Sequence, residues 1–259
     1  MLYEMLPHHP IVHETFAVTP DNTKSIQDCF RIKVNDSGAT LRIMAVIPQF
    51  ETFIRPLFTK SLEEQLRTRS QKSSVSFFSP ESKEEFSLKL GKVSDVLIVE
   101  YRFNEFDELI SQHIYTGRAK LVRHLTFTDY EKYSEKTKHM ELIRQIMQTK
   151  DILRKSYTSD HAKDLKDTRG SGAEFVFLAL ECFNEFCRAF CRINKIPFVS
   201  PPVQRNQGGF RVSLGMARFN HGTVNACSFI NSANLVHHLH GLNPLKMHGK
   251  PIIESLPTI

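Results

Sequence analysis

The sequence lacks any long hydrophobic run. No apolar stretch among its 259 residues approaches the ~20 residues that a membrane-spanning helix needs. Its first segment, MLYEMLPHHPIVHETF, has no basic region followed by an apolar core, so we expect no secretory signal peptide. The same segment lacks the Arg- and Ser-rich amphipathic pattern of an organelle transit peptide, although a cleaved one leaves no trace. We therefore expect no membrane partner.

Cysteine is scarce, and its pattern argues against a disulfide framework. Five cysteines are an odd number, and Cys182, Cys187 and Cys191 fall within one predicted helix, where neighbours at these spacings do not form such a framework. The CxxC pairs that a structural zinc site prefers are also absent. Buried thiols are the favoured interpretation and zinc the alternative. The pattern predicts a reducing intracellular compartment, either the cytosol or an organelle matrix such as that of the mitochondrion.

Motifs for small-molecule chemistry are absent as well. We find no GxSxG, P-loop or GxGxxG segment, and we predict no small-molecule substrate. His237, His238 and His240 suggest a metal site, but no third ligand is near them in the sequence. They also suggest an acyltransferase His-His motif, which needs an acidic residue a few positions later, where Gly241 and Leu242 stand. A structural or surface role is the favoured interpretation.

What the sequence does contain is an excess of positive charge. The formal net charge is +6, and residues 118–169 carry 13 Lys/Arg against 8 Asp/Glu. This excess fits either a solvated helical face or a surface for nucleic acid. If RNA binds there, we expect its phosphates to contact Arg118, Lys120, Arg123, Lys150, Arg154 and Lys155.

Hydrophobic periodicity predicts an α/β (α+β) fold. We predict strands at CFRIKV, 40–48, 94–103, 113–123 and 210–216, and helices at 61–69, within 129–157, at 173–194 and at 232–241. The helix at 173–194 has apolar residues at i+3/i+4 spacing over most of its circumference, so we expect it to be buried. No boundary demands two domains. We therefore predict a single domain, 1–259, with a mixed or antiparallel sheet around that long central helix.

The segment VTPDNTKSIQDC, residues 18–29, carries a family resemblance. It aligns without a gap with the signature turn of the RNB catalytic domain of the ribonuclease II and ribonuclease R family, with Pro20, Thr23, Ile26 and Asp28 matching. Later landmarks follow in the family's order: TKSLEEQLRTRS, SPESKEEFSLKLGKVSDVLIVEY, HIYTGRAKLVRHLTFTDYE, FVFLALECFNEFCRAFC and SFINSANLVHHLHG. The resemblance spans about residues 12–245. It implies an RNB-like domain, without the family's cold-shock and S1 domains.

The departures from the family pattern concern its chemistry. The resemblance implies four aspartates that hold Mg²⁺ in the signature turn, and here the matching positions are Thr19, Ser25, Gln27 and Asp28. Hydroxyl and amide groups do not neutralise a pair of divalent ions as carboxylates do. The family's catalytic arginines also lack a counterpart, because Asn231 and Ser232 stand near their place. Asp21 is a candidate displaced ligand.

We therefore predict a catalytically inactive RNB-like module, a pseudo-exoribonuclease. It would act as a structural or RNA-binding subunit of a larger assembly such as a ribonucleoprotein, with RNA or protein subunits as partners. No cofactor and no metal site are expected. One alternative is a residual Mg²⁺- or Mn²⁺-dependent 3′-to-5′ exoribonuclease that uses Asp21 and Asp28. The other is a protein-interaction subunit without RNA contact.

Overall fold

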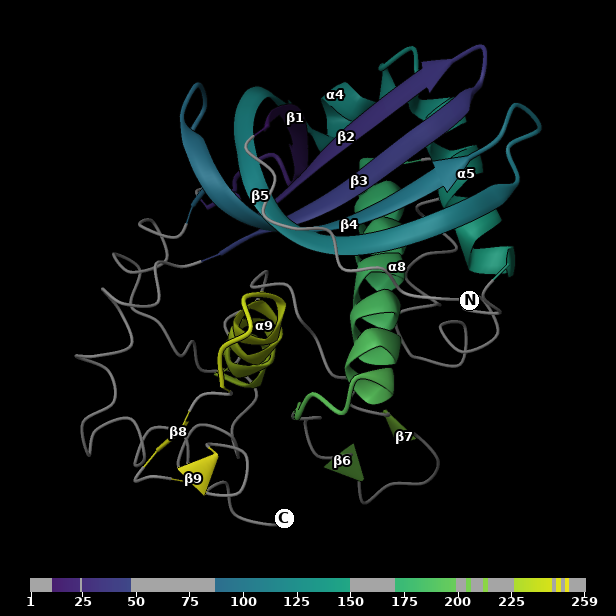
Figure 1. Ribbon diagram of the computed structural model, residues 1–259. Coiled ribbons are helices and arrows are strands. Elements are labelled where there is room, and N and C mark those ends of the chain that lie inside the picture. Colours follow the sequence, from purple (N-terminus) through teal and green to yellow (C-terminus); the bar gives the residue numbers. More distant parts are fainter. Residues whose placement is uncertain are drawn as a thin grey trace.

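The strands of the chain's first half close into a barrel. The structure is a computed structural model that describes residues 11–23, 25–47, 87–149, 171–198, 204–205, 212–213, 226–243, 246–247 and 250–251. Its strands pair in the order β1-β2-β3-β4-β5, with antiparallel neighbours, and β5 closes the barrel by pairing with β1 in parallel (Figure 1). The strands are β1 (Val12–Thr19), β2 (Asp28–Asn35), β3 (Gly38–Val46), β4 (Val93–Phe103) and β5 (Leu109–Thr126).

The strand predictions are confirmed for β2 to β5, whereas β1 is not predicted from the sequence. The predicted strands 40–48 and 94–103 correspond to β3 and β4, and β5 extends beyond both ends of the predicted 113–123. Gly38 in the β2–β3 turn has φ +131°, and a Cβ there would lie 2.1 Å from the carbonyl oxygen of Phe103. Only glycine tolerates both this backbone conformation and this close approach. The predicted helix at 61–69 lies outside the described residues.

Helices follow the barrel and make the fold mixed α+β, as predicted. They are α4 (Phe127–Glu131), α5 (Lys136–Thr149), α8 (Gly172–Ile193) and α9 (Ala226–Leu239). Two small two-stranded sheets add β6 (Gln204–Arg205), β7 (Val212–Ser213), β8 (Lys246–Met247) and β9 (Lys250–Pro251). No helix in the described part of the chain is long and apolar enough to cross a membrane.

Capping residues explain where two of these helices begin. The side chain of Thr126 accepts a hydrogen bond from the backbone N–H of Asp129, whose carboxylate bonds back to the Thr126 N–H, so a capping box starts α4. Ser171 caps α8 in the same way through the N–H of Glu174. For α9 the predicted start at Ser232 is wrong, because the helix begins at Ala226. Its predicted end is confirmed, since Gly241 follows it with φ +69°.

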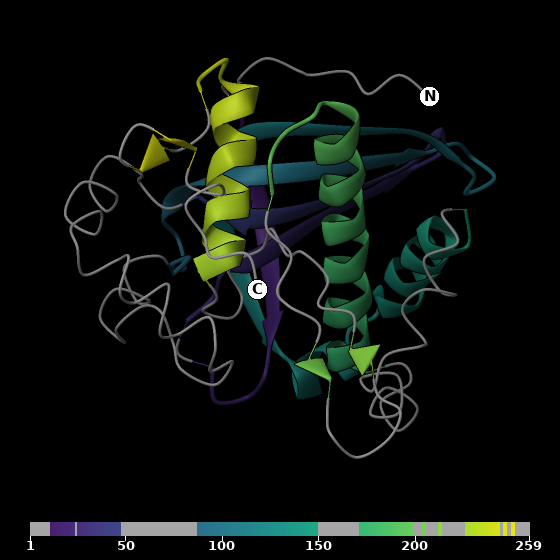
Figure 2. The same cartoon turned by 90° about the horizontal axis from the view of Figure 1, so that it is seen from below.

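Helix α8 forms the centre of the larger hydrophobic cluster. Its Phe183, Phe186 and Phe190 are at most 5% exposed and pack with the outward-facing residues of the strands, which confirms the predicted buried helix. The hydroxyl of Tyr101 in β4 donates to the Cys182 carbonyl at 2.9 Å. Figure 2 shows α8 and α9 on the same side of the strands.

A second, smaller cluster fills the barrel itself. Leu88 is its one buried residue outside the strands, and the other buried residues belong to β1 to β5. One layer consists of Cys29, Met44, Ile98 and Tyr115, which lie directly opposite one another on four neighbouring strands. Residues of a strand alternate between two faces. Each barrel strand therefore has one face in the interior and the other toward the helices.

Four of the five cysteines are buried thiols. Cys29, Cys182, Cys187 and Cys191 are free and buried. Burial raises the pKa of the Cys29 and Cys191 thiols to about 12, and it raises the pKa values of the two others well above the ordinary range. These thiols are therefore protonated at neutral pH and serve as small apolar core groups.

His139 of α5 is enclosed by aromatic rings. Its ring stacks on Phe16 with centroids 5.5 Å apart and lies close to Tyr133 and Phe175. Its Nδ1 contacts the Tyr130 hydroxyl at 3.3 Å. Burial lowers the pKa of His139 from 6.5 to about 4. The folded protein therefore keeps this ring neutral at a pH where the unfolded chain binds a proton.

We predict that this histidine makes folding stability sensitive to mild acid. Its contribution is fully present above pH 6.5 and is lost as the pH falls toward about 4. Between pH 7 and pH 5 the free energy of unfolding should fall by about 1–2 kcal/mol on this account. In His139→Phe, which keeps an aromatic ring, that decrease should be absent in urea titrations at the two pH values. If the free energy of unfolding of His139→Phe falls as much as that of the wild type, another group causes the decrease.

Candidate nucleic-acid interface

The segment that resembles the family's signature turn connects β1 to β2. Thr19 ends β1 and Asp28 begins β2, and the antiparallel pair Phe16–Phe30 places these strand ends side by side. The connection is tied down through its backbone. The N–H of Ile26 donates to the Ser87 hydroxyl at 2.8 Å, and the Ile26 carbonyl accepts from the Leu88 N–H at 2.7 Å.

Thr19 and Asp21 of this connection have hydrogen-bond partners within the fold, whereas one atom of Gln27 has none among the described residues. The Thr19 hydroxyl is 2.7 Å from Nε2 of His124 and donates to the Pro20 carbonyl at 3.2 Å. The Asp21 carboxylate accepts from the Thr128 hydroxyl at 3.3 Å, which holds it toward α4. Within the described residues, Oε1 of Gln27 is buried without a hydrogen-bond partner.

This donor set does not fit a pair of divalent ions. Two-metal sites need several carboxylates around ions about 3.5–4 Å apart, whereas Asp28 is the one carboxylate at the four matched positions 19, 25, 27 and 28. No group of three or more His, Cys, Asp or Glu in the described parts of the chain is placed to hold a metal ion.

Asn231 and Ser232, near the expected place of the family's arginines, are core residues of α9. Both are 0% exposed. The Ser232 hydroxyl has no hydrogen-bond partner among the described residues. The neighbouring Asn234 donates to the Pro197 carbonyl at 3.3 Å, so this face of α9 packs against the segment after α8. Neither an amide nor a hydroxyl supplies the positive charge of a guanidinium.

The predicted RNA-binding residues of β5 have close neighbours of their own. Arg118 is exposed and lies directly opposite Asp95 of β4, while Lys120 lies opposite Glu14 of β1. These acidic cross-strand neighbours reduce the local positive charge. Arg123 stands over the Tyr133 ring, with its guanidinium carbon 5.6 Å from the ring centroid. The other predicted residues, Lys150, Arg154 and Lys155, lie outside the described residues.

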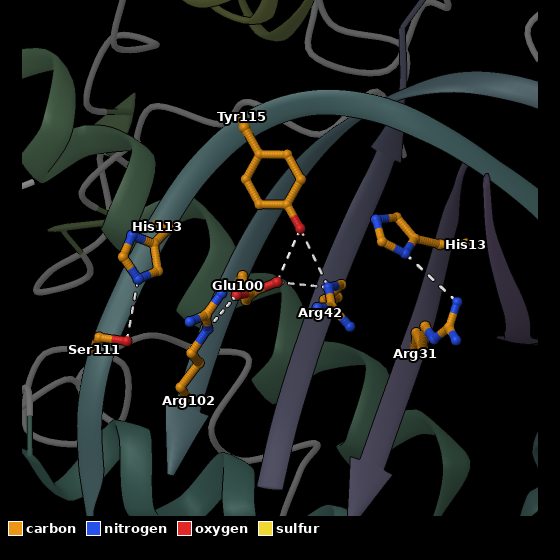
Figure 3. A network of polar contacts seen from close by, with 8 residues as sticks. All are labelled: His13, Arg31, Arg42, Glu100, Arg102, Ser111, His113 and Tyr115. Carbon is orange, nitrogen blue, oxygen red and sulfur yellow. Dashed lines mark hydrogen bonds and ion pairs between the residues drawn. The ribbon is translucent and has the colours of Figure 1, made fainter. Parts of the chain in front are cut away.

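A denser group of cations lies on the interior face of the barrel strands, next to the apolar filling. One row of directly paired residues crosses β2 to β5, and it consists of Arg31, Arg42, Glu100 and His113. The neighbouring row consists of Lys33, Thr40, Arg102 and Ser111. We call these two rows the cationic band. Figure 3 shows their arginines on adjacent strands, together with His13 of β1.

Glu100 is the anchor of the cationic band. Its side chain is 2% exposed, and its oxygens lie 2.6 Å from Nε of Arg42 and 2.6 Å from Nε of Arg102. The Tyr115 hydroxyl donates to the same carboxylate at 2.9 Å. Burial opposes ionisation, but the two arginines and this hydrogen bond outweigh it, so the pKa of Glu100 lies below its usual value. Burial and the nearby carboxylate raise the pKa of Tyr115 to about 12.

Arg31 stands apart from this carboxylate. It lies directly opposite Arg42, and its Nη1 is 3.5 Å from Nδ1 of His13. Neither Arg31 nor Lys33 forms an ion pair with any residue that the structure describes. Burial, followed by repulsion from Arg42, lowers the pKa of Arg31, and a weaker attraction by Glu14 opposes this shift. Two guanidinium groups on paired positions destabilise a sheet unless an anion lies between them.

Sequence reasoning missed the cationic band. Its local signal is the alternation of basic and apolar residues in CFRIKV and in the strand TLRIMAVIP, which places Arg31, Lys33 and Arg42 on single strand faces. That signal does not show that these faces meet. The cross-strand register decides it, because Arg42 and Glu100 are 58 positions apart and yet directly opposite.

Comparisons with known proteins give weak structural likenesses alone. No family model matches the chain, and no curated protein matches it. Among solved structures, the apo form of Mycoplasma genitalium RNase R has 12% identity and a TM-score of 0.48 over 91% of this chain and 44% of that one. The same enzyme in complex with ribose-methylated single-stranded RNA gives 12% and 0.46 over the same shares. Yeast Ssd1, described as a pseudonuclease, gives 17% and 0.41 over 57% of this chain and 19% of that one.

The chain thus spans less than half the length of these structures. A likeness of this strength carries no argument about activity, substrate or partner. The chemistry of the described residues is the basis for a function.

We predict that Glu100→Gln destabilises the fold by about 2–4 kcal/mol, because it leaves the mostly buried Arg42 and the half-exposed Arg102 without their shared counter-ion. Glu105→Gln, at an exposed position of the β4–β5 turn, is the matched control and should change stability by less than about 0.5 kcal/mol. Urea titrations at neutral pH measure both. Equal stabilities of the two variants would contradict the anchoring role of Glu100.

The pH dependence of this effect has a defined sign. The folded-state pKa of Glu100 is depressed, so its contribution is fully present above the ordinary glutamate pKa and is lost as the pH falls through the lower folded value. The difference between wild type and Glu100→Gln should therefore shrink in acid.

Proposed function

We propose that this chain is a non-catalytic RNA-binding module, related in design to RNB domains, that works as a structural subunit of a larger RNA–protein assembly. The observation that carries the proposal is the charge of the barrel. Arginines outnumber carboxylates on the interior face of its strands, whereas the β1–β2 connection retains one carboxylate at its four matched positions. Such a surface is suited to holding phosphates and is poorly suited to holding the cations that cleave them.

The absence of hydrolysis rests on the chemistry of the β1–β2 connection. The Thr19 hydroxyl is hydrogen-bonded within the fold and the Asp21 carboxylate accepts from Thr128, so both groups already serve structural contacts. Removing one charge stabiliser from an active site commonly costs about 10²–10³ in rate. Here three expected carboxylates are replaced together, by Thr19, Ser25 and Gln27.

RNA binding rests on the positive charge. The net charge of +6 and the 13 Lys/Arg of residues 118–169 attract a polyanion. Contacts to phosphates position an RNA without reading its sequence. We propose a partner of this kind, in a reducing intracellular compartment and with no cofactor. Arg123, Lys150, Arg154 and Lys155 remain proposed contacts from the charged region.

We predict that the purified protein does not shorten 5′-labelled single-stranded RNA in Mg²⁺ or in Mn²⁺. Too few carboxylates surround Asp28 to hold two ions against their mutual repulsion. Denaturing gels over a time course measure the products, with Asp28→Asn as the matched control. Processive 3′ shortening that disappears in Asp28→Asn would establish a residual exoribonuclease. Shortening that persists in this variant would come from a contaminating nuclease.

We also predict binding of single-stranded RNA that weakens steeply with salt and varies little with base sequence. Fluorescence anisotropy at 50 and 200 mM salt, with two unrelated RNAs of equal length, measures both properties. Charge reversal at Lys150, Arg154 and Lys155 should reduce the affinity. Absence of binding at low salt would favour the alternative of a protein-interaction subunit.

A further inference from the structure

The cationic band has more positive charge than its own carboxylate balances. It contains Arg31, Lys33, Arg42 and Arg102, with Glu100 as its one acidic member. Both oxygens of Glu100 are engaged, one by Arg102 and the other by Arg42 and Tyr115. The positive charge of the band therefore exceeds the charge of its one carboxylate, and the nearest further attraction that acts on Arg31 comes from Glu14 of β1, with which it forms no ion pair.

The way in which Glu100 holds its arginines leaves them able to bind a ligand. Both ion pairs use the Nε of the arginine. No hydrogen bond within the described part of the chain uses the Nη groups of Arg42 or Arg102. The carboxylate therefore fixes two guanidinium groups in orientation, and their outer N–H edges have no hydrogen-bond partner among the described residues. Such an edge matches two oxygens of a phosphate group.

His113 adds a second, independent observation at the end of the first row. Its Nε2 contacts the Ser111 hydroxyl at 3.1 Å, whereas its Nδ1 is buried and has no hydrogen-bond partner among the described residues. A buried polar atom without a partner destabilises the fold. The paired guanidinium groups of Arg31 and Arg42 are also unfavourable by themselves. The unpartnered histidine nitrogen and the paired guanidinium groups both point to an anionic ligand that would complete the band.

From these contacts we infer that the cationic band is the phosphate-binding surface for single-stranded RNA, with Arg31, Arg42 and Arg102 on successive phosphates and Glu100 as their positioning residue. This inference rests on the proposed function and names the site at which the module would bind RNA. Neighbouring strands are about 4.8 Å apart, so a row across four strands spans about 14 Å. A line of that length suits an extended polyanion better than one small anion, which needs converging donors.

The test compares two double variants with equal charge change. Arg31→Gln/Lys33→Gln removes two cations of the band that form no ion pair with described residues, so the fold should persist. Lys89→Gln/Lys92→Gln removes two exposed cations before β4. Anisotropy with a labelled single-stranded RNA should show at least about a tenfold loss of affinity and a smaller salt slope for the first variant. The second variant should stay within threefold of wild type.

The outcomes separate this inference from the proposed function. No RNA binding by the wild-type protein at low salt would overturn the proposed function. Wild-type binding with equal losses in both variants, or with no loss in Arg31→Gln/Lys33→Gln, would overturn the band alone. Displacement of RNA by polyglutamate at equal concentration would assign the band to an acidic protein segment and would also overturn the inference.

A measurement on the wild-type protein covers the case of a variant that does not fold. Phenylglyoxal modifies accessible arginines, and mass spectrometry locates the modified residues. Bound RNA should protect Arg31 and Arg102 and leave the exposed Arg192 of α8 reactive. Equal modification of Arg31 and Arg102 with and without RNA would overturn the band as the binding surface.

Discussion

The parallel pairing of β5 with β1 is the constraint on which the rest of the structure depends. β5 is 18 residues long, and it pairs along its first part with β4 and along its second part with β1. A register shift between Thr15 and Phe16 accompanies the closure, as β-bulges often do where a sheet bends. Without this pairing the strands would form an open sheet with two unpaired edges.

Closure gives every strand two different environments. Leu97, Val99 and Tyr101 of β4 face α8 and the other helices, whereas Val96 and Ile98 face the barrel interior. Both faces are therefore largely apolar where the barrel is filled. Charged residues on the interior face stand beside this filling, and there the buried carboxylate of Glu100 requires Arg42, Arg102 and Tyr115 as partners. The cationic band arises because the strands extend beyond the apolar side chains that fill the barrel interior.

Local pattern was enough for the elements and not for the candidate site. The strands β3 and β4 and the helix α8 follow from apolar runs and from spacing that a single segment displays. The start of α9 was misplaced, because Ser232 is a serine that caps nothing and is buried in the helix instead. The band depends on register between strands that are distant in sequence. No periodicity within CFRIKV shows that Arg31 will face Arg42.

Hydrolysis and binding of RNA make opposite demands on charge, and the proposed function assigns this chain the second. Metal-assisted cleavage needs anions that hold divalent ions, whereas phosphate binding needs cations at orientations that match phosphate oxygens. The β1–β2 connection uses Thr19 and Asp21 in hydrogen bonds that stabilise the fold. On the interior strand faces, the Glu100 carboxylate orients Arg42 and Arg102. Under the proposed function, the scarcity of carboxylates near Asp28 and the cations around Lys33 are two parts of one charge pattern, since these residues lie towards opposite ends of β2.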